Sequence, residues 1–228
     1  MRIIFINMAF THIFLTFFIY NFFMSRNENV TIKIKYSKVK NLEKICSYFS
    51  QDYTAIQTAQ KTGISRQTVN NYYKLLRTKI TEEFNYIDEI ILKEILETKL
   101  LHIKYINVYK TDIFYIKYKN KILVLDELNS YENKLSNFLQ SSLKNPLTKH
   151  KRANCARVLL CKDNQTFLLS GFLKDEDDSF EDYLQTRLKQ FRGISKEKLF
   201  FYLKESQIRF NSPSEMIYQK IMLSFIKN

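Results

Sequence analysis

Apolar residues recur every three or four positions over much of the first half of the chain. This spacing is typical of helices that bury one face. It predicts short helices over 41–50, 53–63 and 65–77, and helical structure through 81–103. Ser65 is placed to cap the third helix, because its side-chain oxygen can accept a hydrogen bond from the first turn.

The period of the pattern changes at residue 105. The segment "YINVYKTDIFYIKYKNKILVLD" (105–126) contains short β-branched and aromatic runs around a "YKN" turn, and it predicts strands. The runs "ARVLLC" and "TFLLSGF", joined by "KDNQ", predict a β-hairpin. The remaining patterns predict helices over 132–145, 178–191, 196–210 and 213–226. The fold class that follows is α+β.

Changes in composition divide the chain into three segments. Residues 1–24 form an apolar leader, residues 31–103 a helical domain, and residues 104–228 an α+β region that ends in a helical bundle. The middle of the chain is therefore expected to hold a small β-containing part between two helical parts.

The leader is strongly apolar from Ile3 to Phe23, which is about the length of a membrane-spanning helix. Polar residues inside it, such as Asn7 and His12, weaken that interpretation. A second interpretation is that translation begins at Met24 and that the leader is translated upstream DNA. A third is a buried helix. The first interpretation predicts a membrane-anchored protein and the second a cytoplasmic one.

Charge is strongly positive and unevenly distributed. The formal net charge is +13, and residues 31–80 hold ten Lys or Arg against only Glu43 and Asp52. Residues 175–182, "DEDDSFED", hold six acids and no base. A basic domain of this kind favours an anionic partner, such as nucleic acid or a membrane surface.

The stretch "TGISRQTVNNYYKLLRTKI" (62–80) has the pattern of a helix-turn-helix. Ala59 is a small residue where two helices could cross, and Gly63 can adopt the positive φ that the turn requires. The inner face of the second helix is then Ile64, Val69 and Tyr72. Its outer face carries hydrogen-bonding side chains suited to base edges and phosphates: Ser65, Arg66, Gln67, Asn70, Asn71 and Lys74. The alternative is an ordinary helical hairpin with a solvated polar face.

The three cysteines and three histidines do not form a metal-binding pattern. No Cys-x-x-Cys pair exists, which excludes a zinc ribbon on ligand count. Cys155 and Cys161 are expected to be buried structural thiols, since no neighbouring His supports a redox role. The acidic run at 175–182 could bind a hard cation, although an acidic helix start is the favoured interpretation.

Two segments resemble bacterial insertion-sequence transposases of the ISXO-like group. "TAIQTAQKTGISRQTVNNYYKLLR" (54–77) is similar to their helix-turn-helix, A-x-x-x-G-(I/L)-S-(R/N)-x-T-V-N-x-Y-Y. "RLKQFRGISKEKLFFYLKESQIRFN" (187–211) is similar to their C-terminal segment. The two matches occur in the family's order and cover about 50 of the 228 residues.

The resemblance implies DNA strand transfer on an RNase H-like sheet, where two Asp and an Asn or Glu bind two divalent metals. The catalytic motifs depart from the family pattern. Tyr109 stands where the first Asp would be, which leaves Asp126 as its replacement, and the other candidates are Asp163 and Asp175. Mg²⁺ or Mn²⁺ would be required only if these residues are active. The β region is thus either a reduced RNase H-like sheet or an unrelated one.

These observations predict a transposase-family DNA-binding protein of an insertion element, with strand transfer weakened or lost. The alternative is a domesticated helix-turn-helix regulator without enzymatic activity. The expected partner is double-stranded DNA, and the sequence allows a homo-oligomer without requiring one. The expected location is cytoplasmic and nucleoid-associated, or membrane-anchored if residues 3–23 are translated.

Overall fold

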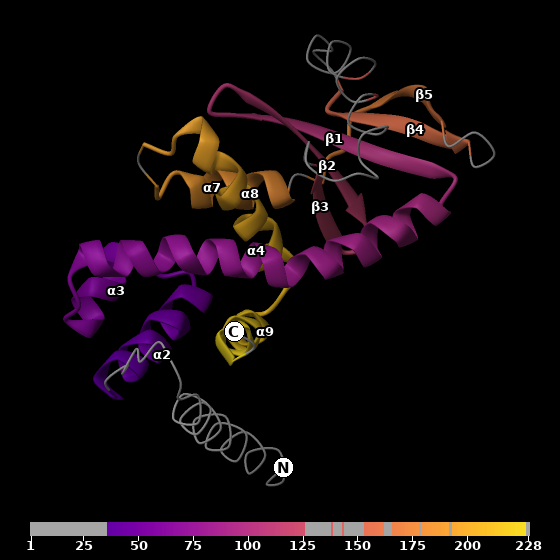
Figure 1. Cartoon of the computed structure of the whole chain (residues 1–228). Helices are drawn as coiled ribbons and strands as arrows, with labels where there is room; N and C mark the ends of the chain where they lie inside the picture. The colour runs from indigo at the N-terminus through magenta and orange to yellow at the C-terminus, as the bar shows by residue number, and fades with distance from the viewer. Residues whose placement is uncertain are drawn as a thin grey trace, which may run out of the picture.

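The computed structural model describes residues 36–125, 138, 143, 153–161, 166–177, 179–191 and 193–226. Within these ranges the chain is α+β, as predicted, with helices on both sides of a five-stranded sheet (Figure 1). The apolar leader and most of the helix predicted at 132–145 fall outside the described residues. The predictions for the leader and for that helix are therefore not tested.

Within the described ranges the chain runs through three helices, five strands and three further helices. The first helices are α2 (Tyr36–Ser50), α3 (Ala55–Thr62) and α4 (Arg66–Glu97). The strands are β1 (Leu100–Val108), β2 (Thr111–Tyr118), β3 (Lys121–Leu125), β4 (Cys155–Cys161) and β5 (Thr166–Leu173). The last helices are α7 (Ser179–Leu188), α8 (Lys196–Asn211) and α9 (Ser214–Ile226), each within a few residues of its predicted range.

The sheet has the strand order β3-β2-β1-β4-β5, and each described pair of neighbours is antiparallel. The predicted turn at "YKN" is confirmed, since Tyr118 pairs with Lys121 across it. The β4–β5 hairpin is also confirmed, with Cys161 opposite Thr166. A further tight turn at Tyr109 and Lys110 was not predicted; both residues have positive φ, at 50° and 62°.

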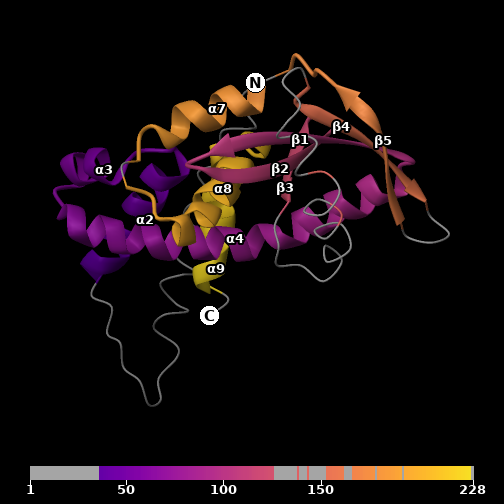
Figure 2. The same cartoon turned by 90° about the horizontal axis from the view of Figure 1, so that it is seen from above.

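Each face of the sheet packs against a different part of the helical structure. The last turns of α4 cover one face, where Ile91 and Ile95 meet the side chains of Leu101, Ile103, Phe114, Ile116, Leu123, Ala156 and Val158. Helices α7 and α8 cover the other face over β1, β2 and β3, through Phe180, Leu184, Leu188, Leu199 and Leu203. Figure 2 shows the sheet from above, with β5 at the margin farthest from α7. The alternation of side chains along each strand is what allows both faces to be buried.

A second core joins the two ends of the described chain. Residues of α2 and the first half of α4 pack directly against α8 and α9. The buried members are Ile45, Cys46, Phe49, Val69, Tyr73, Leu76, Ile80, Phe84, Ile208, Ile217, Ile221 and Met222. The first three helices therefore share their core with the last two.

Helix α4 is continuous for 32 residues, or about 48 Å at 1.5 Å per residue. The expectation that helical structure runs to residue 103 was wrong. The helix ends at Glu97, where Thr98 takes an extended conformation and its hydroxyl donates to the Ile95 carbonyl at 2.6 Å. Leu101 and Ile103 fit a helical period, but they are buried in the sheet instead, because β1 pairs there with β4. Tertiary pairing overrides the local pattern at this point.

Helix α8 covers the outer edge of β3 with three polar side chains. The Asn211 amide accepts from the Ile122 N–H at 2.8 Å and donates to the Ile122 carbonyl at 2.7 Å. Gln207 accepts from the Val124 N–H at 2.8 Å, and Lys204 donates to the Val124 carbonyl at 3.1 Å. These bonds satisfy the backbone groups that an edge strand would otherwise expose.

Candidate nucleic-acid interface

A left-handed glycine joins α3 to α4. Gly63 has φ +72°, and its N–H donates to the Ala59 carbonyl at 2.9 Å, which ends α3. A Cβ would meet nothing within 4 Å there, so the positive φ rather than space is what favours glycine. The Ser65 hydroxyl accepts from the Thr68 N–H at 3.1 Å and starts α4. The predicted turn residue and cap are both confirmed.

The inner side of α4 is anchored by Val69 and Tyr73. Val69 is fully buried, as predicted, whereas Tyr72 is only half-buried and Tyr73 takes the deeper position. Residues three and four positions after Val69 share its face of the helix, and it is Tyr73 whose ring packs edge-to-face on Phe49, 5.0 Å between ring centres. The Tyr73 hydroxyl donates to the Tyr53 carbonyl at 2.9 Å and contacts the Thr58 hydroxyl at 2.6 Å. Burial raises the pKa of Tyr73 to about 12.

The outer side of α4 presents the predicted polar residues to solvent. All six are exposed, and the Ser65 hydroxyl is engaged as the helix cap. The side chains of the other five make no hydrogen bond or ion pair with any residue that the structure describes: Arg66, Gln67, Asn70, Asn71 and Lys74. Five polar side chains therefore project together from the first turns of one helix.

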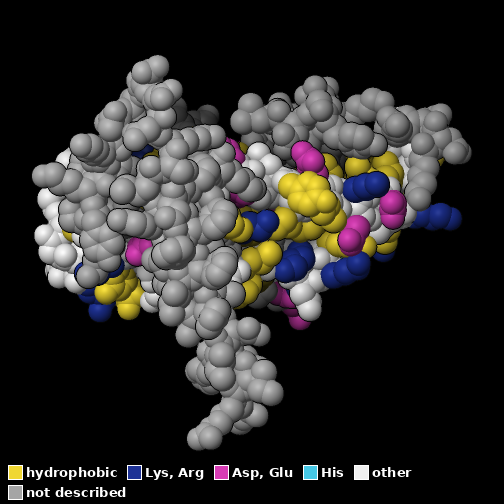
Figure 3. Space-filling model, turned by 60° about the horizontal axis from the view of Figure 1, so that its bottom comes forward, with side chains coloured by type: hydrophobic (Ala, Val, Ile, Leu, Met, Phe, Trp, Pro, Cys, Tyr) yellow, Lys and Arg dark blue, Asp and Glu magenta, His cyan; other side chains and the backbone are white. Residues whose placement is uncertain are grey.

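The charge around these turns is positive at short range. Lys61 and Lys44 are exposed nearby in sequence, and the first turn of α4 holds no acid. Asp52 is engaged with Arg187 at 2.9 Å and with Arg209 at 3.3 Å, so its charge is already compensated. Figure 3 shows basic side chains interspersed with acidic and hydrophobic ones on the described surface that is visible in that view.

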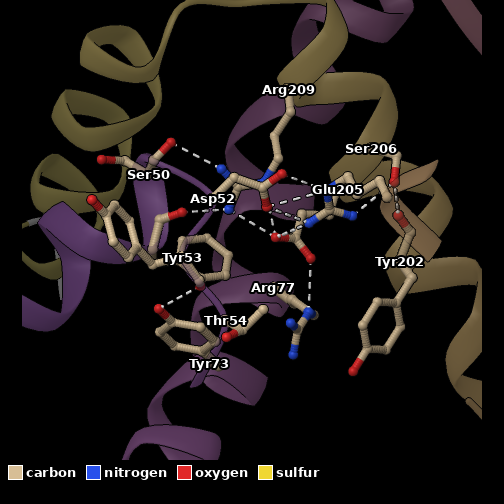
Figure 4. Close-up of polar contacts among 12 residues, drawn as sticks. Ser50, Asp52, Tyr53, Thr54, Tyr73, Arg77, Tyr202, Glu205, Ser206 and Arg209 are labelled. Carbon is tan, nitrogen blue, oxygen red and sulfur yellow. Dashed lines mark hydrogen bonds and ion pairs between the residues drawn. The ribbon is translucent and has the colours of Figure 1, made fainter. Parts of the chain in front are cut away.

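A buried carboxylate lies behind α4 and holds it in place. Glu205 on α8 is about 1% exposed and contacts three arginines, Arg77 at 2.8 Å, Arg187 at 2.7 Å and Arg209 at 2.8 Å (Figure 4). Burial alone would raise the pKa of Glu205, but the charges of the three arginines outweigh it and hold that pKa well below its usual range. The carboxylate therefore stays ionised at neutral pH.

The same network reaches the turn between α2 and α3. Arg209 donates to the carbonyls of Ser50 at 2.9 Å and Phe49 at 2.5 Å, and Arg187 donates to Asp52 (Figure 4). Asp52 itself has φ 63°, so this turn needs support from outside. The network connects α2, α3 and α4 to α7 and α8 at one buried point.

Three residues of this network, Arg187, Glu205 and Arg209, lie in the segment at 187–211, to which the sequence analysis gave no structural role. The signal that could have pointed to them is the abundance of charge in a segment with a buried helical face. Glu205 and Arg209 are four residues apart, a spacing that predicts a pair on one helix. Their long-range partner Arg77 could not be found in this way.

The described residues do not test whether the three catalytic candidates lie close together, because only Asp175 is among them. Asp126 and Asp163 lie outside them. Asp175 is paired with the buried Lys104 at 3.4 Å, and its other oxygen accepts from the Asp177 N–H at 3.0 Å. Tyr109, at the expected place of the first ligand, lies in a tight turn and donates to the Leu188 carbonyl at 3.0 Å.

The acidic run at 175–182 has structural partners. Asp177 accepts from the Ser179 N–H at 3.2 Å at the start of α7 and forms an ion pair with Lys117. Glu181 and Asp182 lie in the first turn of α7, where acids are favoured. Among the described residues, no group of three or more His, Cys, Asp or Glu could hold a metal ion.

Two further predictions concern the thiols and the membrane. Cys155 is buried, as expected, but Cys161 is exposed, because it ends β4 on the open part of a sheet face. Burial raises the pKa of Cys155 to about 11, so this thiol is not nucleophilic at neutral pH. Within the described ranges, no helix is long and apolar enough to cross a membrane.

Comparison of the chain with protein families, with curated proteins and with solved structures found no match.

Proposed function

We propose that the chain binds duplex DNA, using α3, the Gly63 turn and α4 as a helix-turn-helix. The observation that carries this proposal is the set of five exposed side chains on the first turns of α4 that have no partner among the residues the structure describes. A solvated helix face needs no such concentration of amide and guanidinium groups. In the major groove these groups meet donors and acceptors on base edges and the oxygens of phosphates.

The chemistry of each side chain suggests its contact. The Arg66 guanidinium suits guanine or a phosphate, because it presents two parallel N–H donors. The amides of Gln67, Asn70 and Asn71 suit adenine, which offers one donor and one acceptor on its major-groove edge. The Lys74 ammonium is a point charge and suits a phosphate, so it would position the helix without reading sequence.

The length of α4 that can enter a groove is limited by the buried network. Arg77 is fixed to Glu205 at 2.8 Å, and Leu76 and Ile80 are fully buried. We therefore place the contact with the major groove, which is about 12 Å wide, on the exposed side of the turns from Ser65 to Lys74, before the point where Arg77 ties the helix to α8. The rest of the helix serves to hold those turns rigidly.

We further propose transposase ancestry without strand transfer, so that the protein binds DNA but does not cut it. The occupied carboxylate of Asp175 supports this, because a two-metal site needs ligand oxygens free to converge on ions about 3.5–4 Å apart. The helix-turn-helix would then be the part retained from an insertion element, with an RNase H-like origin of the sheet kept only as ancestry. The same observation favours the second candidate, a domesticated regulator.

Selection from a random duplex library tests the proposal. The full chain should enrich one sequence, and log affinity should fall against log salt with a slope of about −4 to −5 if about five phosphates are neutralised. No enrichment, or an affinity independent of salt, would refute DNA binding. Incubation of the bound duplex with Mg²⁺ or Mn²⁺ tests the second part. Metal-dependent cleavage that disappears in Asp175→Ala would show that catalysis survives.

A further inference from the structure

The two edge strands of the sheet, β3 and β5, differ in whether their outer edges are covered. The edge of β3 is covered by Lys204, Gln207 and Asn211 of α8. The outer edge of β5 pairs with no strand among the residues that the structure describes. Its sequence, "TFLLSGFL" (166–173), contains neither a charged residue nor a proline. Exposed edge strands usually carry such residues, because they prevent pairing with another chain.

The register of the sheet identifies the backbone groups that face outward on β5. The Leu160 N–H donates to the Lys99 carbonyl, so the even-numbered residues of β4 face β1 and Leu159 faces β5. Leu159 is opposite Leu168, which therefore turns its backbone groups toward β4. Strand alternation then turns the backbone groups of Phe167 and Leu169, on either side of Leu168, toward the outer edge of β5, where no strand of the described residues lies.

An exposed apolar row ends at this edge. Leu100, Leu159 and Leu168 are direct cross-strand neighbours on β1, β4 and β5, and they are 43%, 42% and 53% exposed. They lie on the face that α7 and α8 cover only over β1, β2 and β3. Neighbours in register on one face are about 5 Å apart, so the three leucines form one continuous patch.

We propose that this edge pairs with the same edge of a second copy, antiparallel and centred on Leu168. In that register Leu168 lies opposite Leu168 of the second copy, and Phe167 exchanges backbone hydrogen bonds with Leu169. The backbone of each residue suits this register. Leu168 already bonds to β4 and needs no hydrogen bond across the axis, whereas the backbone groups of its two neighbours face outward and can bond to the second copy. The leucine row then continues unbroken across the two-fold axis, from three residues to six.

A second copy fits this edge better than another partner. The net charge of +13 would make two copies repel, but the strand that meets itself carries no charge. The shared row consists of leucine alone, so it is complementary to itself. A bulge between Arg157 and Val158 limits the flat part of the edge, so the dimer is small and weak, with a Kd of the order of micromolar.

Sedimentation of the full chain over a range of concentrations tests the pairing. The wild-type chain should shift from monomer to dimer by roughly 100 μM. Leu168→Lys and Leu168→Glu should each raise the Kd of the dimer about tenfold or more, because like charges would lie directly opposite each other. Leu223→Lys, at an exposed leucine on α9, is the matched control and should leave the Kd unchanged.

Mixing the two Leu168 variants tests the register. Lysine on one copy would face glutamate on the other, so an equimolar mixture should form heterodimers at least as well as the wild type does. Leu169→Pro should also weaken the dimer while the monomer still folds, because an edge strand tolerates a proline whose missing N–H faces outward. A wild-type chain that stays monomeric, or a mixture that does not dimerise, would overturn the proposal.

Discussion

Arg66 and Arg77 lie about three turns apart on the same helix and have opposite surroundings. Arg66 is exposed and has no partner in the described part of the chain, whereas Arg77 binds Glu205 and stacks on Tyr202 at 4.3 Å. Gln67, Asn70 and Asn71, on the same exposed face, also have no side-chain partner among the described residues. Around Arg77 the polar contacts are buried, with Glu205 about 1% exposed, and no described buried side-chain nitrogen or oxygen lacks a hydrogen bond.

The difference separates two uses of polar side chains in one helix. A buried charge must be compensated within the chain, because desolvation would otherwise cost several kcal/mol. An exposed cluster has no such requirement, so its composition is free to suit an outside partner. We therefore propose that the network around Glu205 serves stability and that the face around Asn70 serves binding. Substitutions in the two regions should have effects of different kind.

Removing Glu205 should have the largest effect. Glu205→Ala leaves Arg187, which is about 2% exposed, without its closest carboxylate at 2.7 Å. We expect a loss of about 3–5 kcal/mol in the free energy of unfolding, measured by urea denaturation. Arg66→Ala is the matched control and should change it by less than about 0.5 kcal/mol. A loss below about 1 kcal/mol for Glu205→Ala would contradict a structural role.

Lowering the pH should weaken the same network. The pKa of Glu205 is held below its usual range in the folded chain, so its contribution is fully present above the pKa of an unfolded Glu, about 4.3. It is lost as the pH falls below that value toward the folded pKa. Urea titrations from pH 6 to pH 3 should show this loss in the wild type and a smaller one in Glu205→Gln. If the free energy of unfolding falls equally with pH in the two proteins, the Glu205 carboxylate does not contribute to stability.

Removing one amide side chain from the exposed face should affect DNA binding alone. Asn70→Ala should weaken binding to the selected duplex by about 1–3 kcal/mol, or about 5- to 150-fold, while binding to random duplex changes little. Asn85→Ala is the control, because Asn85 is exposed on the same helix but lies beyond the turns that can enter a groove. Fluorescence anisotropy with both duplexes measures the effect. Equal losses in the two variants would place the interface elsewhere.

The smallest expected effect is that of a single phosphate contact. Lys74→Ala should weaken binding to all duplexes alike and reduce the salt slope by about 1. Lys93→Ala, at an exposed lysine near the other end of α4, should leave the slope unchanged. Titrations at several salt concentrations measure both. If Lys74→Ala instead relaxes sequence preference, Lys74 contacts a base.

Local signals in the sequence were sufficient for much of the fold and for the candidate face. Gly63 follows Ala59 at the spacing of a turn, and Ser65 is a strong cap, so the start of α4 was placed correctly. The hairpin of β4 and β5 follows from two apolar runs around a short polar segment. These features depend on a few neighbouring residues, which a sequence displays directly.

Other features depend on pairing between distant residues and could not be predicted. Arg77 and Glu205 are 128 positions apart, and no spacing rule connects them. The turn at Tyr109 and Lys110 lacks the glycine or asparagine that normally marks positive φ. The start of β1 at Leu100 is set by its pairing with β4, although its residues also fit a helix. In each case a distant contact decides a local conformation.

The central claim is that the first turns of α4 are polar because DNA is their partner. The most direct test replaces Gln67, Asn70 and Asn71 together with alanine and measures binding to the selected duplex and urea unfolding on the same protein. We predict that sequence-specific binding is lost, by at least about 100-fold, while the free energy of unfolding changes by less than about 1 kcal/mol. Unchanged binding, or a loss of binding that accompanies a large loss of stability, would contradict the claim.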